Sequence, residues 1–221
     1  MRVLIFVIRY SLLNRLTAAT LACVAVGLTA IRANQDWVPS GVKDGVALAF
    51  RDLPNLDARE VRAIAEIPHA VERILPIVCD FTQTLDPDVR EAKILSGDVS
   101  TRYSIYLRYA PRYVVVVPRD VVIEVRRESN GCTWSEIAGP MERRSGTVRM
   151  PLLRGAWVVE ALEPSRARAT YQIAVKPGGS IPGWLVRRGA ASALPRVIEQ
   201  VTRCLSSTTA GGRCSARSAR D

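Results

Sequence analysis

Two adjacent charged residues, Arg119 and Asp120, are the first candidates for chemistry. They follow Pro118 and open the alternating run 121–128 of a predicted strand. A guanidinium beside a carboxylate forms an ion pair, the structural role we favour here, or holds a polar ligand group inside a cavity. A neighbouring predicted strand offers further hydroxyls for a ligand, those of Tyr103, Tyr106 and Tyr109.

The sequence offers little for nucleophilic or metal-dependent catalysis. His69 is its one histidine, so a nucleophile that relies on a histidine base would have to use that residue. The cysteines form no CxxC pair, and a single histidine does not give zinc-ligand spacing. We therefore expect no metal, no cofactor and a binding role rather than a catalytic one.

Apolar and aromatic residues form a second set of candidates for ligand binding. They alternate with polar residues along predicted strands and therefore share one face of a sheet. The set comprises Tyr103, Ile105, Met150, Trp157, Tyr171 and Ile173. Such residues line a cavity or fill a core, and for each of them the core role is the more common. Trp184 suits the rim of a cavity, because its ring is large and amphipathic.

The composition is that of a globular domain with a basic surface. The 221 residues include 48% hydrophobic and 24% charged ones, and the formal net charge is +10. No basic run is interleaved with aromatic residues, so we expect no nucleic-acid binding. The positive surplus favours contact with an anionic membrane surface.

Four cysteines lie after the apolar leader, and a fifth, Cys23, lies within it. The four are Cys79, Cys132, Cys204 and Cys214. Buried free thiols are the simpler interpretation, and the one we favour. In an exported domain the four could instead form two disulfides, with three possible connectivities.

Residues 1–33 have the composition of a targeting segment. Arg9 and Arg15 precede the uncharged, apolar stretch 16–31, and the small residue Ala33 follows it. This order predicts a secretory signal peptide, since a membrane span needs roughly 20 apolar residues. An uncleaved anchor and a lipoprotein site at Cys23 are the alternatives. In each case we expect an exported domain, periplasmic, secreted or anchored to the membrane.

The rest of the chain predicts an α+β domain over residues 37–205. A polar joint (34–43) comes first, and a disordered tail (206–221) comes last. Between them we expect two strands, a helix, a run of antiparallel strands and one long terminal helix. The expected ranges are strands 45–51 and 60–67, helix 68–80, strands 89–95, 100–109, 121–128, 132–138, 147–162 and 168–176, and helix 180–205.

The junction 177–182 delivers the last strand into the terminal helix. Pro177 and the pair Gly178 and Gly179 end the strand, and Ser180 can cap the helix that follows. Pro195 lies inside that helix and should kink or divide it. This helix is the one large cover available for the sheet, so we expect a curved sheet that grips it around an apolar cavity.

The order of these segments resembles the START domain, the StAR-related lipid-transfer domain of the helix-grip superfamily. Five segments carry the resemblance: 44–51, 61–67 with the following helix, 118–122, the pair 148–150 and 155–157, and 177–185. They span nearly the whole expected domain. The resemblance implies a helix-grip fold that binds or transfers one hydrophobic molecule such as a sterol, phospholipid or fatty acyl species.

Two other functions stay open on the same scaffold. One is an enzyme similar to polyketide cyclases and aromatases, suggested by Arg119, Asp120 and the tyrosines near candidate cavity strands. The other is a small-ligand sensor, which is the weakest because the sequence offers no second domain to receive a signal. We favour non-enzymatic lipid binding.

Overall fold

The structure, a computed structural model, describes residues 37–110, 117–139, 141–142, 144–181, 183–207 and 214, and leaves the side chains of 183–192 outside that description. The chain divides into two units, residues 1–38 and 39–221. The expected targeting segment, 1–33, lies outside the described residues. In the part that the structure describes, no helix is long and apolar enough to cross a membrane.

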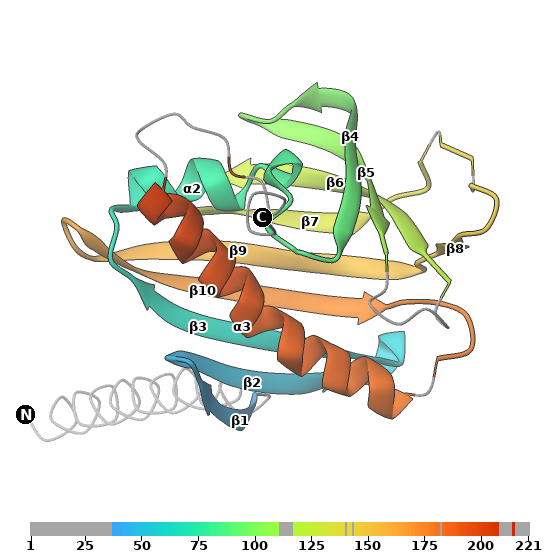
Figure 1. Cartoon of the computed structure of the whole chain (residues 1–221), viewed down its shortest axis with the longest axis horizontal. Coiled ribbons are helices and arrows are strands. Elements are labelled where there is room, and N and C mark those ends of the chain that lie inside the picture. The colour runs from blue at the N-terminus through green and yellow to red at the C-terminus, as the bar shows by residue number, and fades with distance from the viewer. Residues whose placement is uncertain are drawn as a thin grey trace, which may run out of the picture. The chain divides into compact units, whose positions relative to one another are not determined.

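One ten-stranded sheet forms the body of the second unit (Figure 1). Its strands follow the order β1-β2-β3-β10-β9-β7-β6-β5-β4, and β8 pairs with β6 beside this path. All the other pairings for which the register is known are antiparallel. The strands are β1 (Val38–Lys43), β2 (Val46–Leu53), β3 (Ala58–Ile67), β4 (Val89–Asp98), β5 (Arg102–Tyr109), β6 (Arg119–Glu128), β7 (Gly131–Glu136), β8 (Val148–Arg149), β9 (Leu152–Glu163) and β10 (Arg166–Lys176).

Two α-helices accompany the sheet, and Figure 1 shows the longer one running across one face of it. They are α2 (Val71–Val78) and α3 (Gly183–Ser207), with short 3-10 turns η1 (Pro54–Leu56) and η2 (Phe81–Gln83). Helix α3 packs on β2, β3 and α2. We call the covered side of the sheet the inner face and the opposite side the outer face.

Alternation along the strands decides which side chains face α3. In β5, Tyr103, Ile105 and Leu107 join the hydrophobic core, whereas Ser104 and Tyr106 belong to the other face. The β5–β6 register pairs Leu107 with Val121 and Ile105 with Ile123, which continues the core across the sheet. From α3 the core receives Leu194, Val197, Ile198, Val201, Cys204 and Leu205.

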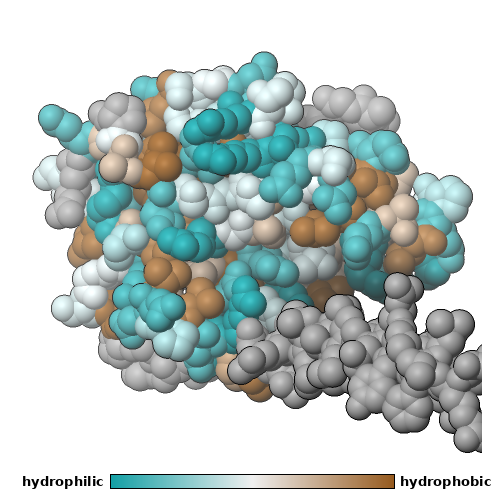
Figure 2. Space-filling view, turned by 180° about the vertical axis from the view of Figure 1, so that it is seen from behind, coloured by the Kyte–Doolittle hydropathy of each residue, from teal (hydrophilic) through white to brown (hydrophobic). Residues whose placement is uncertain are grey.

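The outer face carries ion pairs within and between its strands. Figure 2 shows this side, where hydrophilic and hydrophobic residues are interspersed. Arg51 of β2 pairs with Glu60 of β3 at 2.6 Å, and Glu124 of β6 pairs with Arg102 of β5 at 2.5 Å and with Arg126 of its own strand at 2.8 Å. Surface pairs of this kind contribute little stability each. Because these charged side chains lie on the outer face, the inner face is the apolar one.

The predicted α+β fold with a terminal helix is confirmed, and the expectations about its two ends are wrong. The joint 34–43 contains strand β1, which is exposed along its whole length and therefore lacks the apolar alternation that marks a strand. Helix α3 continues through Pro195 as one helix, so the proline does not divide it, and Leu194 and Val197 on either side are buried in the core. Ser206 and Ser207 belong to α3, so the predicted disorder does not begin at 206.

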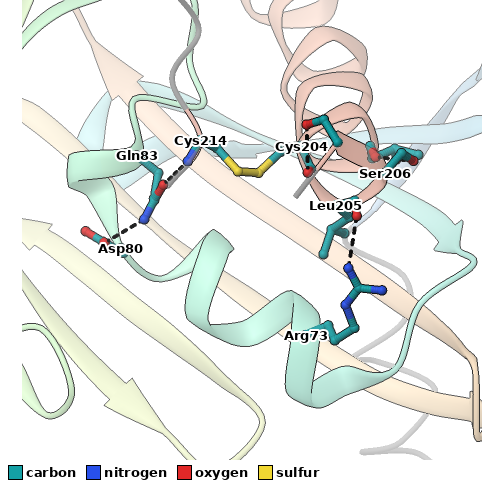
Figure 3. The surroundings of a disulfide bond; sticks show 9 residues. Arg73, Asp80, Gln83, Cys204, Leu205, Ser206 and Cys214 are labelled. Carbon is teal, nitrogen blue, oxygen red and sulfur yellow. Dashed lines mark hydrogen bonds between the residues drawn. A yellow bond between two sulfur atoms is a disulfide. The ribbon is translucent and has the colours of Figure 1, made fainter. Parts of the chain in front are cut away.

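Two disulfides replace the free thiols that we favoured from the sequence. Cys79, directly after α2, pairs with Cys132 in β7, with their Cα atoms 5.8 Å apart. Cys204 in α3 pairs with Cys214, with their Cα atoms 5.6 Å apart (Figure 3). Cys214 is buried, so the tail is ordered at this residue also.

The two disulfides should stabilise the fold unequally. Their sequence separations are 53 and 10 residues. Loop-closure entropy in the unfolded chain therefore predicts losses of about 4 kcal/mol for Cys79→Ala with Cys132→Ala, and about 3 kcal/mol for Cys204→Ala with Cys214→Ala. Urea unfolding of the two double variants measures these losses. Equal losses, or a larger loss at the shorter loop, would contradict the entropic explanation.

Candidate functional site

A pocket opens on the inner face between the sheet, the segment after α2 and helix α3. Its walls come from β4, β5, β7, β9 and β10 on the sheet side, and from Val78 of α2 and Val197 of α3 on the helix side. The lining residues are Val78, Asp80, Phe81, Thr84, Leu85, Asp86, Val89, Leu107, Tyr109, Trp134, Leu153, Trp157, Tyr171, Ile173 and Val197. Most of these side chains are apolar or aromatic, which is typical of sites for small organic ligands.

Four aromatic rings in series form the floor of the pocket. Phe81 meets Trp134 edge-on at 5.1 Å between ring centroids, and Trp134 lies 5.8 Å from Tyr171. Tyr171 stacks on Trp157 at 4.4 Å. The β10–β9 register explains this last contact, because it places Tyr171 directly opposite Trp157. The rings fill much of the space that a ligand would take.

A few polar groups interrupt the apolar lining. The indole Nε1 of Trp134 is buried and has no hydrogen-bond partner among the described residues. Burial raises the pKa of Tyr171 and of Tyr109, and the negative charge of Asp86 raises both further. Both phenols therefore stay protonated at neutral pH and can donate hydrogen bonds. The pocket lining thus includes the Trp134 indole and the hydroxyls of Thr84, Tyr109 and Tyr171 as donors, and the carboxylates of Asp80 and Asp86 as acceptors.

The pocket is small in this conformation. Its volume is about 50 Å³, whereas sites for drug-sized ligands enclose roughly 300–1,000 Å³. Water or a small polar group fits without change. A lipid requires that the rings turn or that α3 moves away from the sheet.

Three of the nine candidate residues predicted from the sequence line this pocket: Trp157, Tyr171 and Ile173. Three others lie elsewhere in the core. Tyr103 donates its hydroxyl hydrogen to the carbonyl of Cys79 at 2.8 Å and accepts from the amide of Phe81 at 3.0 Å, so its hydroxyl holds the chain after α2. Ile105 and Met150 are buried core residues outside the lining. Trp184 lies outside the described side chains.

The expected ion pair between Arg119 and Asp120 does not form, because successive strand residues point to opposite faces of the sheet. Asp120 lies on the outer face, fully buried, and accepts from Arg149 Nε at 2.8 Å and Nη2 at 3.2 Å. Tyr106 also donates to it, at 3.4 Å. Asp120 therefore fixes the chain around β8 and does not reach the pocket.

Hydrogen bonds to Asp120 control its ionisation. Burial alone would raise the pKa of this carboxyl, but the hydrogen bonds and charge of Arg149, together with hydrogen bonds from Thr147 and Tyr106, outweigh it. The pKa of Asp120 is therefore lowered. The carboxylate stays charged and paired at neutral pH.

Sequence reasoning missed several lining residues, among them Phe81, Trp134 and Asp86. Phe81 and Asp86 lie in the irregular segment between α2 and β4, where no periodicity assigns a face. Trp134 lies on β7, and its two-residue spacing from the buried Cys132 would have placed it on the inner face. Tyr109 was noted for its hydroxyl and does line the pocket.

The junction between β10 and α3 lies close to the strand pair β6–β8. Gly178 and Gly179 have φ angles of +69° and +68°, a backbone conformation that suits glycine. A Cβ atom on Gly178 would lie 3.0 Å from the carbonyl oxygen of Arg149 and 3.1 Å from Val148 Cγ1. On Gly179 the nearest atom would be 3.6 Å away. The first glycine is thus required by space as well as by φ.

The described residues contain no cluster of three or more histidine, cysteine, aspartate or glutamate side chains that could hold a metal ion. The lining of the pocket, apolar with a few hydrogen-bonding groups, suits the binding and orientation of a ligand.

An antiparallel sheet that holds one long C-terminal helix over an aromatic pocket is the helix-grip architecture, and this chain has its START-like form. The expected fold is thereby confirmed. No protein-family model matches the chain.

Two solved structures show the same fold. One is the STAR-related lipid transfer protein of Xanthomonas axonopodis, which is 21% identical, with a TM-score of 0.68 over 77% of this chain and 99% of that one. The other is human StAR-related lipid transfer protein 5, which is 16% identical, with a TM-score of 0.71 over 87% of this chain and 97% of that one. At these identities the likeness concerns the fold.

A curated relative covers a similar share of the chain. It is "Uncharacterized protein PA1579" of Pseudomonas aeruginosa, which is 27% identical over 188 residues, covering 77% of this chain and 87% of its own length.

Replacing Asp120 with Asn should destabilise the fold in a pH-dependent way. Breaking one partner of a buried ion pair predicts a loss of about 3 kcal/mol at pH 7. Because the pKa of Asp120 is lower in the folded state, the carboxylate contributes fully above the unfolded value of about 3.9, and this contribution is lost as the pH falls through the folded pKa. The gap between wild type and variant should therefore narrow below about pH 4. Urea unfolding from pH 7 to pH 3 measures it.

The exposed pair of Glu199 with Arg203 provides the control. Glu199→Gln should change the free energy of unfolding little at any of these pH values, because solvent screens the pair. A gap for Asp120→Asn that stays constant down to pH 3 would show that the loss does not come from the carboxylate charge.

Alanine at the two junction glycines should have unequal effects. Gly179→Ala carries the cost of a positive φ, about 1 kcal/mol, while Gly178→Ala adds the crowding against Arg149 and Val148 and should cost about 2 kcal/mol or more. Gly45→Ala is the matched control, since Gly45 has a φ of +77° and open space around its Cβ position. Urea unfolding compares the three. Equal losses at Gly178 and Gly45 would contradict the close packing at the junction.

Proposed function

We propose that this protein binds, and transfers, one hydrophobic lipid-type molecule in the pocket under α3, without catalysis. The observation that carries the proposal is the lining itself, a largely apolar and aromatic surface beneath a single covering helix with a few hydrogen-bonding groups. The names of the two similar structures, both lipid transfer proteins, support it. The ligand class is a sterol, phospholipid or fatty acyl species.

We expect such a ligand to enter the pocket where the N-terminal end of α3 moves away from the sheet. The C-terminal end is held by the disulfide of Cys204 and by Arg73, which donates to the carbonyl of Leu205 at 3.1 Å (Figure 3). The N-terminal end instead follows the glycine pair 178–179. Since the C-terminal end is held, we expect the N-terminal end of α3 to move away from the sheet. The two glycines would act as the hinge, because hinge residues absorb the change in backbone angles.

The second candidate is an enzyme on the same scaffold, similar to the polyketide cyclases and aromatases. Asp86 beside Tyr109 and Tyr171 is the observation that favours it, because these groups could orient a polar substrate. Asp120 no longer supports it, since this carboxylate lies on the outer face. Turnover of a polyketide that is lost in Asp86→Asn while ligand binding persists would establish the enzyme over the carrier.

Export of the domain is part of the proposal. Two disulfides are expected in an oxidising compartment and are rare in the cytosol. The composition of residues 1–33 supports a signal peptide or a membrane anchor. A basic protein in that position would exchange its ligand with an anionic membrane surface.

Filling the pocket should abolish lipid binding. Ile173→Trp adds bulk at the lining, and we expect the affinity for a fluorescent acyl lipid to fall at least tenfold, by about 1.4 kcal/mol or more. Titration of delipidated protein, followed by lipid fluorescence, measures this. Gln172→Trp is the matched control, because the neighbouring residue of β10 points to the outer face and should bind normally.

Equal binding by both variants would place the ligand outside this pocket. Failure of the delipidated wild-type protein to bind any component of a lipid extract, followed by native mass spectrometry, would overturn the proposed function itself.

A further inference from the structure

Two charged side chains are buried among the described residues, Arg119 and Asp120, and only one of them has a counter-charge. Asp120 has Arg149. Arg119 is 8% exposed and forms no ion pair with a described carboxylate. Residues 111–116, which precede Val117 in the sequence, and Pro182, which follows Ile181, are outside the described residues and include no aspartate or glutamate.

Backbone carbonyls are the acceptors that Arg119 reaches. Its Nη1 donates to the carbonyl of Val117, and its Nη2 lies 3.5 Å from the carbonyl of Gly178, at the limit of a hydrogen bond. Its Nε is buried without a partner. A guanidinium has five N–H donors in a planar fork that matches carboxylate or phosphate oxygens. Several of these donors therefore remain for a ligand.

Arg119 lies next to the proposed lipid pocket. The β5–β6 register places it directly opposite Tyr109, on the inner face, and Tyr109 lines the pocket. On its other side a Cβ on Gly179 would be 3.6 Å from Nη2 of Arg119. Helix α3 begins four residues after that glycine, and the free N–H groups of a helix N-terminus also favour an anion.

We propose that Arg119 receives the acidic group of an amphiphilic ligand, a carboxylate or phosphate, between the start of β6 and the Gly178–Gly179 turn. The apolar part of the ligand would pass Tyr109 into the pocket. This inference rests on the proposed lipid binding and adds the chemistry of the headgroup. An anion there would supply the counter-charge that Arg119 does not have among the described residues. Burial disfavours the charged guanidinium and lowers its pKa, so an anion beside it would stabilise the charged form.

The test compares an acid with its neutral ester, each titrated into delipidated full chain in a phosphate-free buffer. We expect the wild type to bind oleate about tenfold more tightly than methyl oleate, or better, because a charge-assisted fork is roughly twice as strong as neutral hydrogen bonds. Arg119→Gln should bring the two affinities together while leaving methyl oleate unchanged. Arg126→Gln removes the same charge from an exposed position of the same strand and should keep the wild-type preference.

Thermal unfolding separates this role from a structural one. Removing a buried cation without a counter-charge should leave the melting temperature of Arg119→Gln unchanged or raised, whereas a structural arginine would lower it. Should the Gln variant fail to fold, Arg119→Lys keeps the charge and loses the fork, so the preference for oleate should shrink without vanishing.

Each remaining outcome decides the inference. Equal affinity of the wild type for oleate and methyl oleate would overturn the anion site and leave lipid binding intact. If neither lipid binds, the proposed function fails. In that case inorganic phosphate that raises the melting temperature of the wild type, and not of Arg119→Gln, would establish a free-phosphate site instead. No effect of phosphate would overturn the site as well.

Discussion

The fold depends on one constraint, that α3, together with the shorter α2, must cover the inner face of a ten-stranded sheet. The sheet brings Tyr103, Ile105 and Leu107 of β5 and their neighbours to one side, and α3 supplies the buried stripe that meets this face. The disulfide of Cys204 and the hydrogen bond from Arg73 fix the C-terminal end of the helix. Gln83 strengthens this anchor, because its side chain accepts from the amide of Cys214 at 2.6 Å and donates to Asp80 at 3.0 Å (Figure 3). Any space for a ligand must therefore be gained at the other end.

Strand alternation at the start of β6 separates two charges that are adjacent in the sequence. Asp120 turns outward, where Arg149 and Tyr106 satisfy it and tie the chain around β8 to the sheet. Arg119 turns inward, where it meets carbonyl groups and an apolar surface. A buried charge without a counter-charge costs free energy, so the position of Arg119 beside a pocket indicates a role in binding. Asp120 is paired with Arg149, and its role is structural.

Sequence reasoning predicted most of the fold, because apolar alternation and helical spacing are local signals. It placed β10, α3 and the glycine junction, and it assigned Trp157, Tyr171 and Ile173 to the face where the structure has them. It missed β1, which has no buried face, and the pocket residues Phe81 and Asp86, whose positions depend on the irregular chain after α2. Pairing of Asp120 with Arg149 was also beyond reach, because 29 residues separate the partners and only the β6–β8 contact brings them together.

The small volume of the pocket is compatible with lipid binding when the competing contacts are compared. A ligand that displaces the ring of Trp157 from Tyr171 forfeits a stacking contact worth about 0.5–1.5 kcal/mol beyond its area. An acyl chain that removes roughly 200 Å² of its surface from water gains about 5 kcal/mol at 25 cal/mol per Å². The displaced rings also keep much of their burial if they turn along the sheet. We therefore expect the aromatic rings to fill the pocket and exclude water when no ligand is bound. They should move aside for a ligand whose apolar burial contributes more free energy than the lost ring contact.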